Sequence, residues 1–489
     1  MVSDAGLQTQ LSCGGIAVRF RTRAAIIIKK SCCKLVDLNK IVEFFKNSNI
    51  PQNILNRGQL VLNEFLKPLK ILLEQKAVPK KPWSDEQIEL FLQILSQMDT
   101  DKDFEAARVG EREARISSKI HLKTSAGFCH GVGRSGFLTA PQPKAPGGSM
   151  MYEITNYLAR NFFKNFGLPN IKGAIVVPLC TGMSLSLCLS ALKPDWNDES
   201  LINKRVVLVP QIDHKSILKS LDLIGVKPKV VEGKIFGDAV RVPIEDIKNK
   251  LDDDCFAIIS ITSFFPPREH DDLKEICKFA KEKNLVHVII NAYGVQSPEW
   301  MKLIRSAIDA GRVDAVIQST DKNFLTPVGG AVIASPSKEI VEKISKAYAG
   351  RASATPVVNF LISMLSLGIE GYQQLLEEQQ ENRNLLENKL KEVANEIGER
   401  VLDIFNPVAV AMSLETIEKN QLLALGGALY NLRVTGPRVF DPDDEEFGTC
   451  CKAYSTPYII MNAAIGASST DILSAVEKFK KAYQQVTQK

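Results

Sequence analysis

The middle of the chain alternates short runs of β-branched residues with helical segments, and this alternation constrains the fold more than any other feature. The runs lie at 174–178, 205–210, 257–261, 286–290, 314–318 and 331–334. Segments with helical spacing of apolar residues lie between them, at 185–192, 215–223 and 272–283. Short apolar strands separated by helices form a mostly parallel sheet with helices on both faces. We therefore predict an α/β fold whose ligands bind beyond the carboxyl ends of the strands.

Helical and mixed segments flank this α/β region. Apolar residues recur at helical spacing from 53 to 75, and Ser84 with Gln87 forms a capping-box pattern at the start of a second helix. We expect a basic disordered extension at 1–34, a helical N-terminal layer at 35–120, a large α/β domain at 121–355, a connecting helix at 356–400 and a small α+β C-terminal domain at 401–489. In the last domain, strands are expected at 401–405, 408–414, 428–433 and 458–462, and a helix at 471–484.

The net charge of +5 is concentrated at the N-terminus. Residues 1–34 hold six basic residues and one acidic residue, so the rest of the chain is neutral. Binding of a nucleic acid would then depend on local basic patches. The ten cysteines form no CxxC pair of zinc-ribbon spacing, and no run of eighteen or more apolar residues occurs. We expect no metal site, no membrane span and the reduced thiols of a cytoplasmic protein.

Residues 131–136 match the dinucleotide-binding pattern GxGxxG, but their context argues against that use. The pattern requires a strand before it and a helix after it, whereas three prolines occur between 141 and 146. The glycines and Arg134 instead suit the capture of an anion such as phosphate, and Ser135, Gln142 and Lys144 add further donors. From these residues alone, an ordinary surface loop rich in glycine and proline remains the alternative.

Three more groups of polar residues follow predicted strands. Lys322 lies in a loop after the run at 314–318, Thr181 begins a helix after 174–178, and His214 follows 205–210. A lysine can form a Schiff base with an aldehyde cofactor, a helix N-terminus can hold a phosphate, and an imidazole can stack on a pyridine ring. Each could instead be an ordinary surface lysine, turn residue or capped polar side chain. Their convergence on one edge of the sheet predicts a binding site there.

Eight segments occur in an order that is typical of a known family. They lie at 109–115, 133–136, 142–145, 181–184, 292–296, 321–323, 327–330 and 348–354. With them, roughly residues 35–489 resemble the O-phosphoseryl-tRNA(Sec) selenium transferases of the compact archaeal type. The resemblance implies a fold-type I transferase dependent on pyridoxal 5'-phosphate (PLP), which makes selenocysteinyl-tRNA(Sec) from O-phosphoseryl-tRNA(Sec) and selenophosphate. It also implies a cytoplasmic homotetramer with sites at subunit interfaces.

The resemblance further implies which residues meet the cofactor. Lys322 would hold PLP as a Schiff base and, once freed, act as the catalytic base. Arg112 would contact the cofactor phosphate. The full implied set is Arg112, Thr181, His214, Asn291 and Lys322. The position that usually meets the pyridine nitrogen holds Ile290, so either Asn291 takes that contact through a shifted register or the nitrogen has no strong partner.

A second implied set meets the substrate. The phosphate of the phosphoseryl group would be received by Arg134, Ser135, Gln142 and Arg351, with Lys144 supporting the same loop. Glu111 would repel a free carboxylate and so select the tRNA-borne amino acid over free phosphoserine. The tRNA acceptor arm would meet the N-terminal layer, where the candidate contacts are Lys67, Lys70, Lys76, Lys80 and Lys81.

Two other functions remain open on the sequence. A sulfur-using synthase would make cysteinyl-tRNA from the same phosphoseryl-tRNA with cysteine nucleophiles, and Cys129 and Cys180 lie near the motif loops. A non-catalytic tRNA-binding relative would be expected to have lost the lysine loop. The segment 321–323 and the arginines Arg134 and Arg351 are present, which favours the enzyme.

Overall fold

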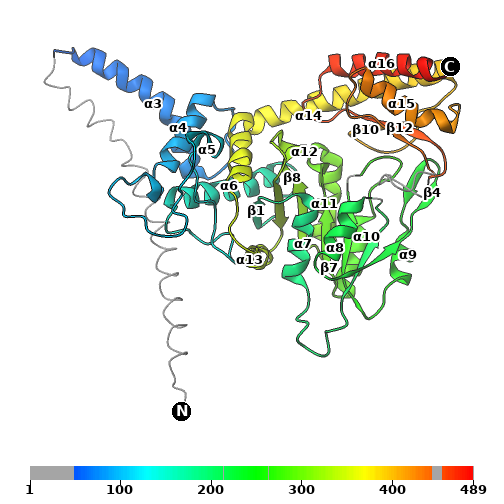
Figure 1. Cartoon of the computed structure of the whole chain (residues 1–489), viewed down its shortest axis with the longest axis horizontal. Coiled ribbons are helices and arrows are strands. Elements are labelled where there is room, and N and C mark those ends of the chain that lie inside the picture. The colour runs from blue at the N-terminus through cyan, green and yellow to red at the C-terminus, as the bar shows by residue number, and fades with distance from the viewer. Residues whose placement is uncertain (1–48, 213, 263, 443–453, 488–489) are drawn as a thin grey trace. The chain divides into compact units, whose positions relative to one another are not determined.

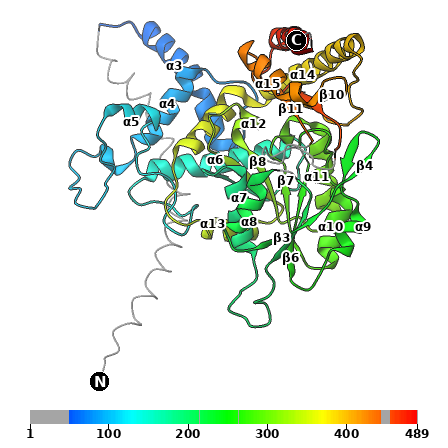
Figure 2. The same ribbon diagram turned by 45° about the vertical axis from the view of Figure 1, so that its right-hand side comes forward.

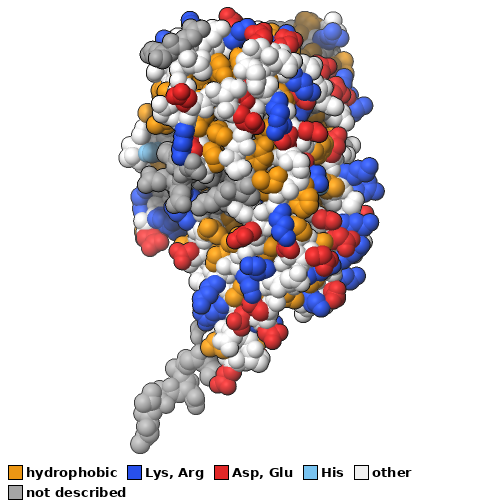
Figure 3. Space-filling model, turned by 90° about the vertical axis from the view of Figure 1, so that its right-hand side faces the viewer, with side chains coloured by type: hydrophobic (Ala, Val, Ile, Leu, Met, Phe, Trp, Pro, Cys, Tyr) orange, Lys and Arg blue, Asp and Glu red, His pale blue; other side chains and the backbone are white. Residues whose placement is uncertain are grey.

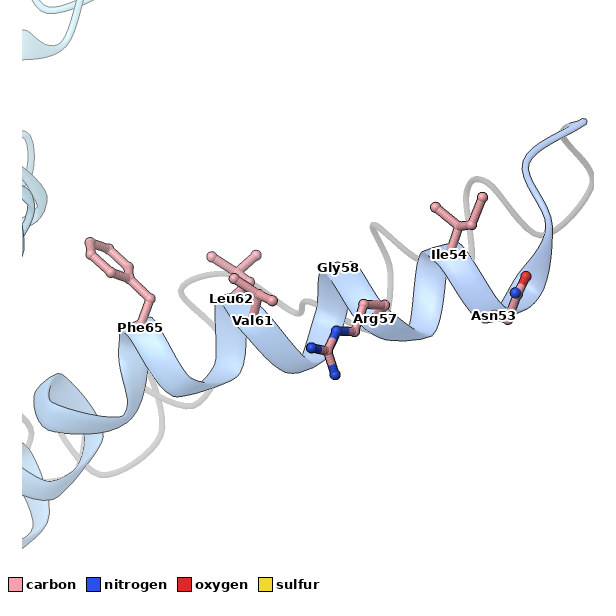
Figure 4. A pocket seen from close by; sticks show the side chains of 7 residues that line it. All are labelled: Asn53, Ile54, Arg57, Gly58, Val61, Leu62 and Phe65. Carbon is pink, nitrogen blue, oxygen red and sulfur yellow. The ribbon is translucent and has the colours of Figure 1, made fainter.

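The computed structural model describes residues 49–212, 214–262, 264–442 and 454–487, and its contacts divide the chain into Met1–Lys76 and Ala77–Lys489. The predicted extension at 1–34 lies outside the described residues. In the first unit, α3 (Gln52–Gln75) is the helix that the apolar spacing predicts, and it ends at Lys76 in the left-handed region with φ 53°. Figure 4 shows Ile54, Val61, Leu62 and Phe65 projecting from this helix together with Arg57.

The second unit begins with a short helical layer. The predicted capping box is confirmed, because Ser84 Oγ accepts from the Gln87 N–H and the Gln87 side chain accepts from the Ser84 N–H, so α4 (Asp85–Ser96) starts at Asp85. The layer continues with η2 (Thr100–Lys102), α5 (Lys119–Thr124) and α6 (Pro146–Asn165). These elements bring the segment 99–148 against the α/β region.

A seven-stranded sheet forms the centre of the described structure. In spatial order its strands are β1 (Gly173–Val177), β9 (Ala331–Ser335), β8 (Ala315–Ser319), β7 (Val286–Ile290), β6 (Cys255–Ile261), β2 (Val206–Pro210) and β3 (Lys227–Val231). The neighbours from β8 to β3 pair in parallel, and only β9 runs antiparallel to its two neighbours. The prediction of a mostly parallel sheet is confirmed.

Helices cover both faces of this sheet (Figures 1 and 2). On one side lie α7 (Thr181–Leu192) and α8 (Lys215–Asp222), and on the other lie α10 (Leu273–Glu282) and α11 (Pro298–Ala310). The remaining elements of the domain are β4 (Lys234–Phe236), β5 (Ala239–Arg241), α9 (Ile244–Asn249), η3 (Gly294–Gln296), α12 (Thr320–Phe324) and α13 (Lys338–Lys346). Ile276 and Phe279 of α10 belong to the same core cluster as Ile258 of β6. The side chain of Ile258 therefore lies on the face of the sheet that α10 covers.

An aromatic cluster anchors the loop that follows β8. Phe324, the last residue of α12, is fully buried, and its ring lies 5.1 Å from that of Phe162 in α6 and 5.0 Å from that of Phe360. Phe360 and Tyr372 belong to α14 (Thr355–Ile397), the connecting helix that the sequence predicts. The helix is interrupted at Gly368, with φ 61° and ψ −171°, where a Cβ would come within 2.9 Å of the backbone of Pro79 and Lys81.

The C-terminal domain departs from the prediction at two segments. It contains β10 (Ala409–Ser413), α15 (Lys419–Asn431), β11 (Arg438–Phe440), β12 (Tyr458–Asn462) and α16 (Ser469–Thr487). The strand predicted at 428–433 is wrong, since the segment ends α15, whose buried Leu422, Leu425 and Leu429 have helical spacing. The strand predicted at 401–405 is also wrong, because Val401 forms only an isolated bridge to Met412.

On the face shown in Figure 3, basic and acidic side chains are interspersed. None of the described helices is both long and apolar enough to cross a membrane. The charge pattern agrees with the neutral composition outside residues 1–34.

The aromatic cluster provides a test of what holds α12 in place. Phe360→Ala removes a fully buried ring that packs against Phe324, and we expect it to lower the free energy of unfolding by about 3–5 kcal/mol. Thermal and denaturant unfolding measure the change. Leu423→Ala, at a leucine that is 88% exposed, is the control and should change little. Equal melting temperatures for the two variants would contradict the assignment.

Candidate active site

Lys322 lies at the carboxyl end of β8, in the first turn after the strand. Its side chain keeps an exposed surface, as a group that receives a ligand must. Burial of the surrounding site lowers the pKa of its ammonium group, Asp321 opposes the shift, and the positive charge of Arg438 adds to it. A lowered pKa increases the neutral fraction of the amine, which is the form that attacks an aldehyde or accepts a proton.

The backbone around Lys322 is held by buried side chains from two other segments and by the side chain of Asn323. Gln296 donates to the Lys322 carbonyl at 2.7 Å, and Tyr372 of α14 donates to the Asn323 carbonyl at 3.0 Å. Asn323 itself donates to the Ala292 carbonyl at 2.9 Å and accepts from the Val295 N–H at 3.2 Å. The lysine therefore projects from a fixed platform.

His214 and Cys180 lie near the same amine. His214 caps α8, and its Nδ1 is 2.6 Å from Ser216 Oγ. Burial lowers the pKa of His214, and the charges of Lys322 and Arg438 lower it further. Cys180 directly precedes α7 and is exposed, and its electrostatic effect raises the pKa of Lys322. The positive charge of Lys322 thus acts on His214, which follows the end of β2.

Thr181 is the first residue of α7, next to Cys180. Cys180 makes no side-chain hydrogen bond to the helix, so the first N–H groups of α7 have no side-chain cap. Gly182 allows α8 to approach closely, since a Cβ there would lie 3.0 Å from Ser220 Oγ. An uncapped helix N-terminus of twelve residues, beside an accessible lysine, can receive the phosphate of a cofactor.

Asn291 does not join this group. In the parallel pairing of β6 with β7, Ile258 is level with His287, and Ile258 packs on α10. Alternation along β7 therefore directs His287 and Asn291 to the α10 side and Ile290 to the α7 side. Consistent with this, Asn291 accepts from Thr262 Oγ1, and its Nδ2 lies 3.5 Å from Met301 Sδ of α11. The residue that faces the Lys322 side of the sheet here is apolar.

The predicted substrate residues form a second group, around a pocket of about 760 Å³ that we call the Arg351 pocket. Glu111, Arg112 and Arg351 line it, together with Gly131, and Arg112 Nε lies 3.5 Å from Glu111 Oε1. The loop with Arg134 and Ser135 runs beside the pocket, because the Val132 N–H donates to the Ala352 carbonyl at 3.0 Å. Both Arg134 and Ser135 are exposed.

Gln142 and Lys144 support this loop from within the protein. Gln142 is buried, and its Nε2 lies 3.5 Å from the Gly133 carbonyl. Lys144 donates to Glu113, a buried carboxylate at a left-handed backbone position with φ 48°. Donation from Lys144 lowers the pKa of Glu113. The two residues therefore hold the loop, and Arg134, Ser135 and Arg351 remain available to a ligand.

The residues that line the Arg351 pocket do not include Lys322. Over the described residues, no hydrogen bond or ion pair joins Lys322 to any residue of the Arg351 pocket, and no cluster of three His, Cys, Asp or Glu side chains could hold a metal ion. Sequence reasoning missed Arg438 and Glu113. Glu113 lies inside the motif at 109–115, whereas Arg438 has no motif that would have identified it, since only the packing of β11 brings it near Lys322.

Known proteins resemble this chain over most of its length. The family model of O-phosphoseryl-tRNA(Sec) selenium transferase matches residues 98–484. The O-phosphoseryl-tRNA(Sec) selenium transferase of Methanococcus maripaludis is 42% identical over 447 residues, which cover 90% of this chain and 99% of the relative. A serine palmitoyltransferase from S. paucimobilis solved with a bound PLP–myriocin aldimine has a TM-score of 0.53 at 15% identity, covering 77% of this chain and 86% of that chain, and shares the fold.

A crystal structure of an archaeal O-phosphoseryl-tRNA(Sec) selenium transferase is the more similar fold. It has a TM-score of 0.83 and 43% identity, and the match covers 89% of this chain and 98% of that chain. The chain therefore belongs to the O-phosphoseryl-tRNA(Sec) selenium transferase family and has the fold-type I architecture of PLP-dependent enzymes.

Proposed function

We propose that this chain converts O-phosphoseryl-tRNA(Sec) to selenocysteinyl-tRNA(Sec) in the cytoplasm, with PLP as cofactor and selenophosphate as selenium donor. The observation that carries the proposal is the accessible lysine at the end of β8, whose backbone is fixed and whose pKa is lowered by burial. It stands in a chain that shares 42% identity with a selenium transferase over nearly its whole length.

The residues around Lys322 fit PLP. Lys322 offers an amine for the aldehyde, the α7 N-terminus with Thr181 offers N–H groups for the phosphate, and His214 offers a ring beside the amine. When bound, PLP supplies an electron-withdrawing pyridine ring that eases loss of the Cα proton. Ile290 faces this side of the sheet, so the side chain that β7 would present to the ring is apolar, whereas Asn291 turns to α11.

The proton and the phosphate leave toward different residues. Freed by the substrate amine, Lys322 removes the Cα proton, since its lowered pKa keeps part of the amine neutral. Phosphate then leaves from Cβ toward Arg134 and Arg351, whose guanidinium groups bind a dianion with charge-assisted hydrogen bonds. Selenium of selenophosphate then bonds to Cβ of the resulting dehydroalanyl-tRNA, and the Lys322 ammonium returns its proton to Cα. Water cleaves the selenium–phosphorus bond, which releases phosphate and leaves the selenocysteinyl group.

The separation of the two groups supports assembly from more than one chain. Lys322 and the Arg351 pocket carry complementary parts of one reaction, and nothing described joins them within a chain. We infer that the pocket of a second copy completes the site, within the homotetramer that the family resemblance implies. Arg112 then reaches the cofactor phosphate from the second copy, and Glu111 repels a free carboxylate beside it.

The tRNA is expected to bind the N-terminal helices. Lys67 and Lys70 lie on α3, where Lys67 pairs with Glu64 at 3.3 Å through exposed side chains. Lys80 lies 3.6 Å from Glu370, also at the surface. Exposed ion pairs of this kind are weak, so these lysines can exchange their partners for phosphates at little cost.

Removal of the lysine amine tests the cofactor assignment. Lys322→Ala should lose covalent attachment of PLP, because no other described residue offers an amine on the fixed platform. Visible absorbance, borohydride reduction and mass mapping of the labelled peptide measure the attachment. Lys343→Ala, at an exposed lysine of α13, is the control and should retain the label. Label on a peptide without residue 322 in the wild type would refute the assignment.

Removal of one guanidinium tests the phosphate site. Arg351→Ala should lower kcat/KM for phosphoseryl-tRNA by about 10²–10³, since it leaves the departing dianion with one guanidinium instead of two. Arg305→Ala, at an exposed arginine of α11, should leave kcat/KM within about twofold. Single-turnover assays with selenophosphate, and in parallel with sulfide, measure both rates. Turnover with sulfide alone would show that the sulfur-using alternative is correct.

A further inference from the structure

A buried polar cluster lies behind the Arg351 pocket, and the mechanism above makes no use of it. It consists of Asp99, Asp101, Lys102 and His130, and we call it the His130 cluster. Three of its side-chain atoms are buried and have no hydrogen-bond partner: Asp99 Oδ2, Asp101 Oδ1 and His130 Nε2. Unpaired buried polar atoms are costly. Two carboxylate oxygens and one imidazole nitrogen are unpaired in this cluster, and each is an atom that can carry a proton.

Two of the unpaired atoms face each other. His130 Nε2 lies 3.4 Å from Asp101 Oδ1, and the two side chains are only 2% and 6% exposed. The other oxygen of Asp101 already accepts from Lys102 Nζ at 2.6 Å, and Lys102 also donates to the Gly127 carbonyl at 2.7 Å. A hydrogen on Nε2 that points to Asp101 Oδ1, with an approach of a few tenths of an ångström, would satisfy both atoms.

The surroundings of His130 shift its pKa in both directions, and the downward shift is the larger. Burial lowers the pKa of His130 most, Arg351 and Lys102 lower it further, and Asp101 and Glu113 raise it. Asp99 adds a carboxyl whose pKa burial raises to about 6. Because the pKa of His130 lies below its ordinary value, the imidazole is neutral at neutral pH when the pocket holds no anion.

His130 connects this cluster to the pocket. It lines the same pocket as Arg351 and directly precedes Gly131. A Cβ added at Gly131 would lie 2.4 Å from the Ala352 carbonyl oxygen, so the two backbones are in close contact there. The loop with Arg134 starts at this close contact. A dianion beside Arg351 would neutralise the positive charge that opposes protonation of His130 most strongly. The charge of the dianion itself would also favour the imidazolium.

We propose that His130 is a positioning residue that takes up a proton when a doubly charged oxyanion binds in the Arg351 pocket, and that Asp101 holds the resulting imidazolium. The imidazolium then donates to Asp101 and fixes the backbone at Gly131, where the anion-binding loop begins. The inference rests on the proposed function, because it takes this pocket as the phosphate site. It adds that phosphate binding and proton uptake are coupled.

Sulfate is a suitable probe, because it keeps its double charge across the neutral range while phosphate does not. Sulfate is titrated into the holoenzyme by calorimetry near neutral pH, in two buffers with different enthalpies of ionisation. The dependence of the heat on the buffer gives the number of protons taken up. We expect between about 0.3 and about 1 proton per sulfate for the wild type, and an affinity that falls by up to about tenfold per pH unit as the pH rises.

Two substitutions assign the proton. His130→Gln keeps an amide donor toward Asp101 but cannot titrate, so proton uptake and the pH dependence of affinity should both disappear while sulfate still binds. Asp101→Asn should reduce the proton uptake, because it removes the carboxylate that stabilises the imidazolium and leaves the His130 ring in place. The matched control is His121→Gln, which removes the other histidine that lines the pocket and should leave the uptake unchanged. Melting temperature and oligomeric state show whether each variant folds.

The possible results distinguish the coupling of anion binding to proton uptake from the phosphate site of the proposed function. Sulfate binding without proton uptake in the wild type overturns the coupling and leaves the proposed function intact. Uptake that survives in His130→Gln, or disappears in His121→Gln, also overturns it. No sulfate binding to the wild type removes the anion site itself, and the proposed phosphate site with it. If His130→Gln does not fold, unchanged uptake in a folded Asp101→Asn variant overturns the role of the pair.

Discussion

The clamp on the backbone of α12 is the constraint on which the rest of the site depends. Gln296, Asn323 and Tyr372 bind main-chain groups at 292, 295, 322 and 323, and Phe324 anchors the same turn in an aromatic cluster. A lysine side chain has several freely rotating bonds, so its amine is positioned only if its own backbone is fixed. The buried amides provide this fixation at the end of a parallel strand, where a ligand can reach the amine.

The surroundings of Lys322 and those of the Arg351 pocket have opposite electrostatic effects. Around Lys322, burial and Arg438 disfavour the charged amine, which prepares it to react. Around the Arg351 pocket, guanidinium groups stay exposed or half-buried, while Glu113 and the His130 cluster neutralise the charge beneath them. A covalent nucleophile and an anion site thus require different surroundings, and building them on separate segments allows both within one fold.

The position of Ile290 distinguishes this chain from the usual arrangement of fold-type I enzymes that the sequence comparison implied. Alternation along β7 puts Ile290 on the α7 side and Asn291 among Thr262 and Met301. Of the two explanations that the sequence left open, a shifted register for Asn291 is the less compatible with this packing.

The sequence by itself determined the mostly parallel sheet, the capping box at Ser84, the connecting helix and the lysine that follows β8, because these depend on local periodicity and on residues close in the chain. The predicted strand at 428–433 is wrong because Gly426 and Gly427 interrupt the apolar pattern of α15, so its last turn has the local pattern of a short strand. Tertiary structure alone decided which side chains share a site. Arg438 approaches Lys322, His130 faces Asp101, and Asn291 turns away, because burial, strand alternation and packing between segments far apart in the chain set these contacts, and no local pattern records them.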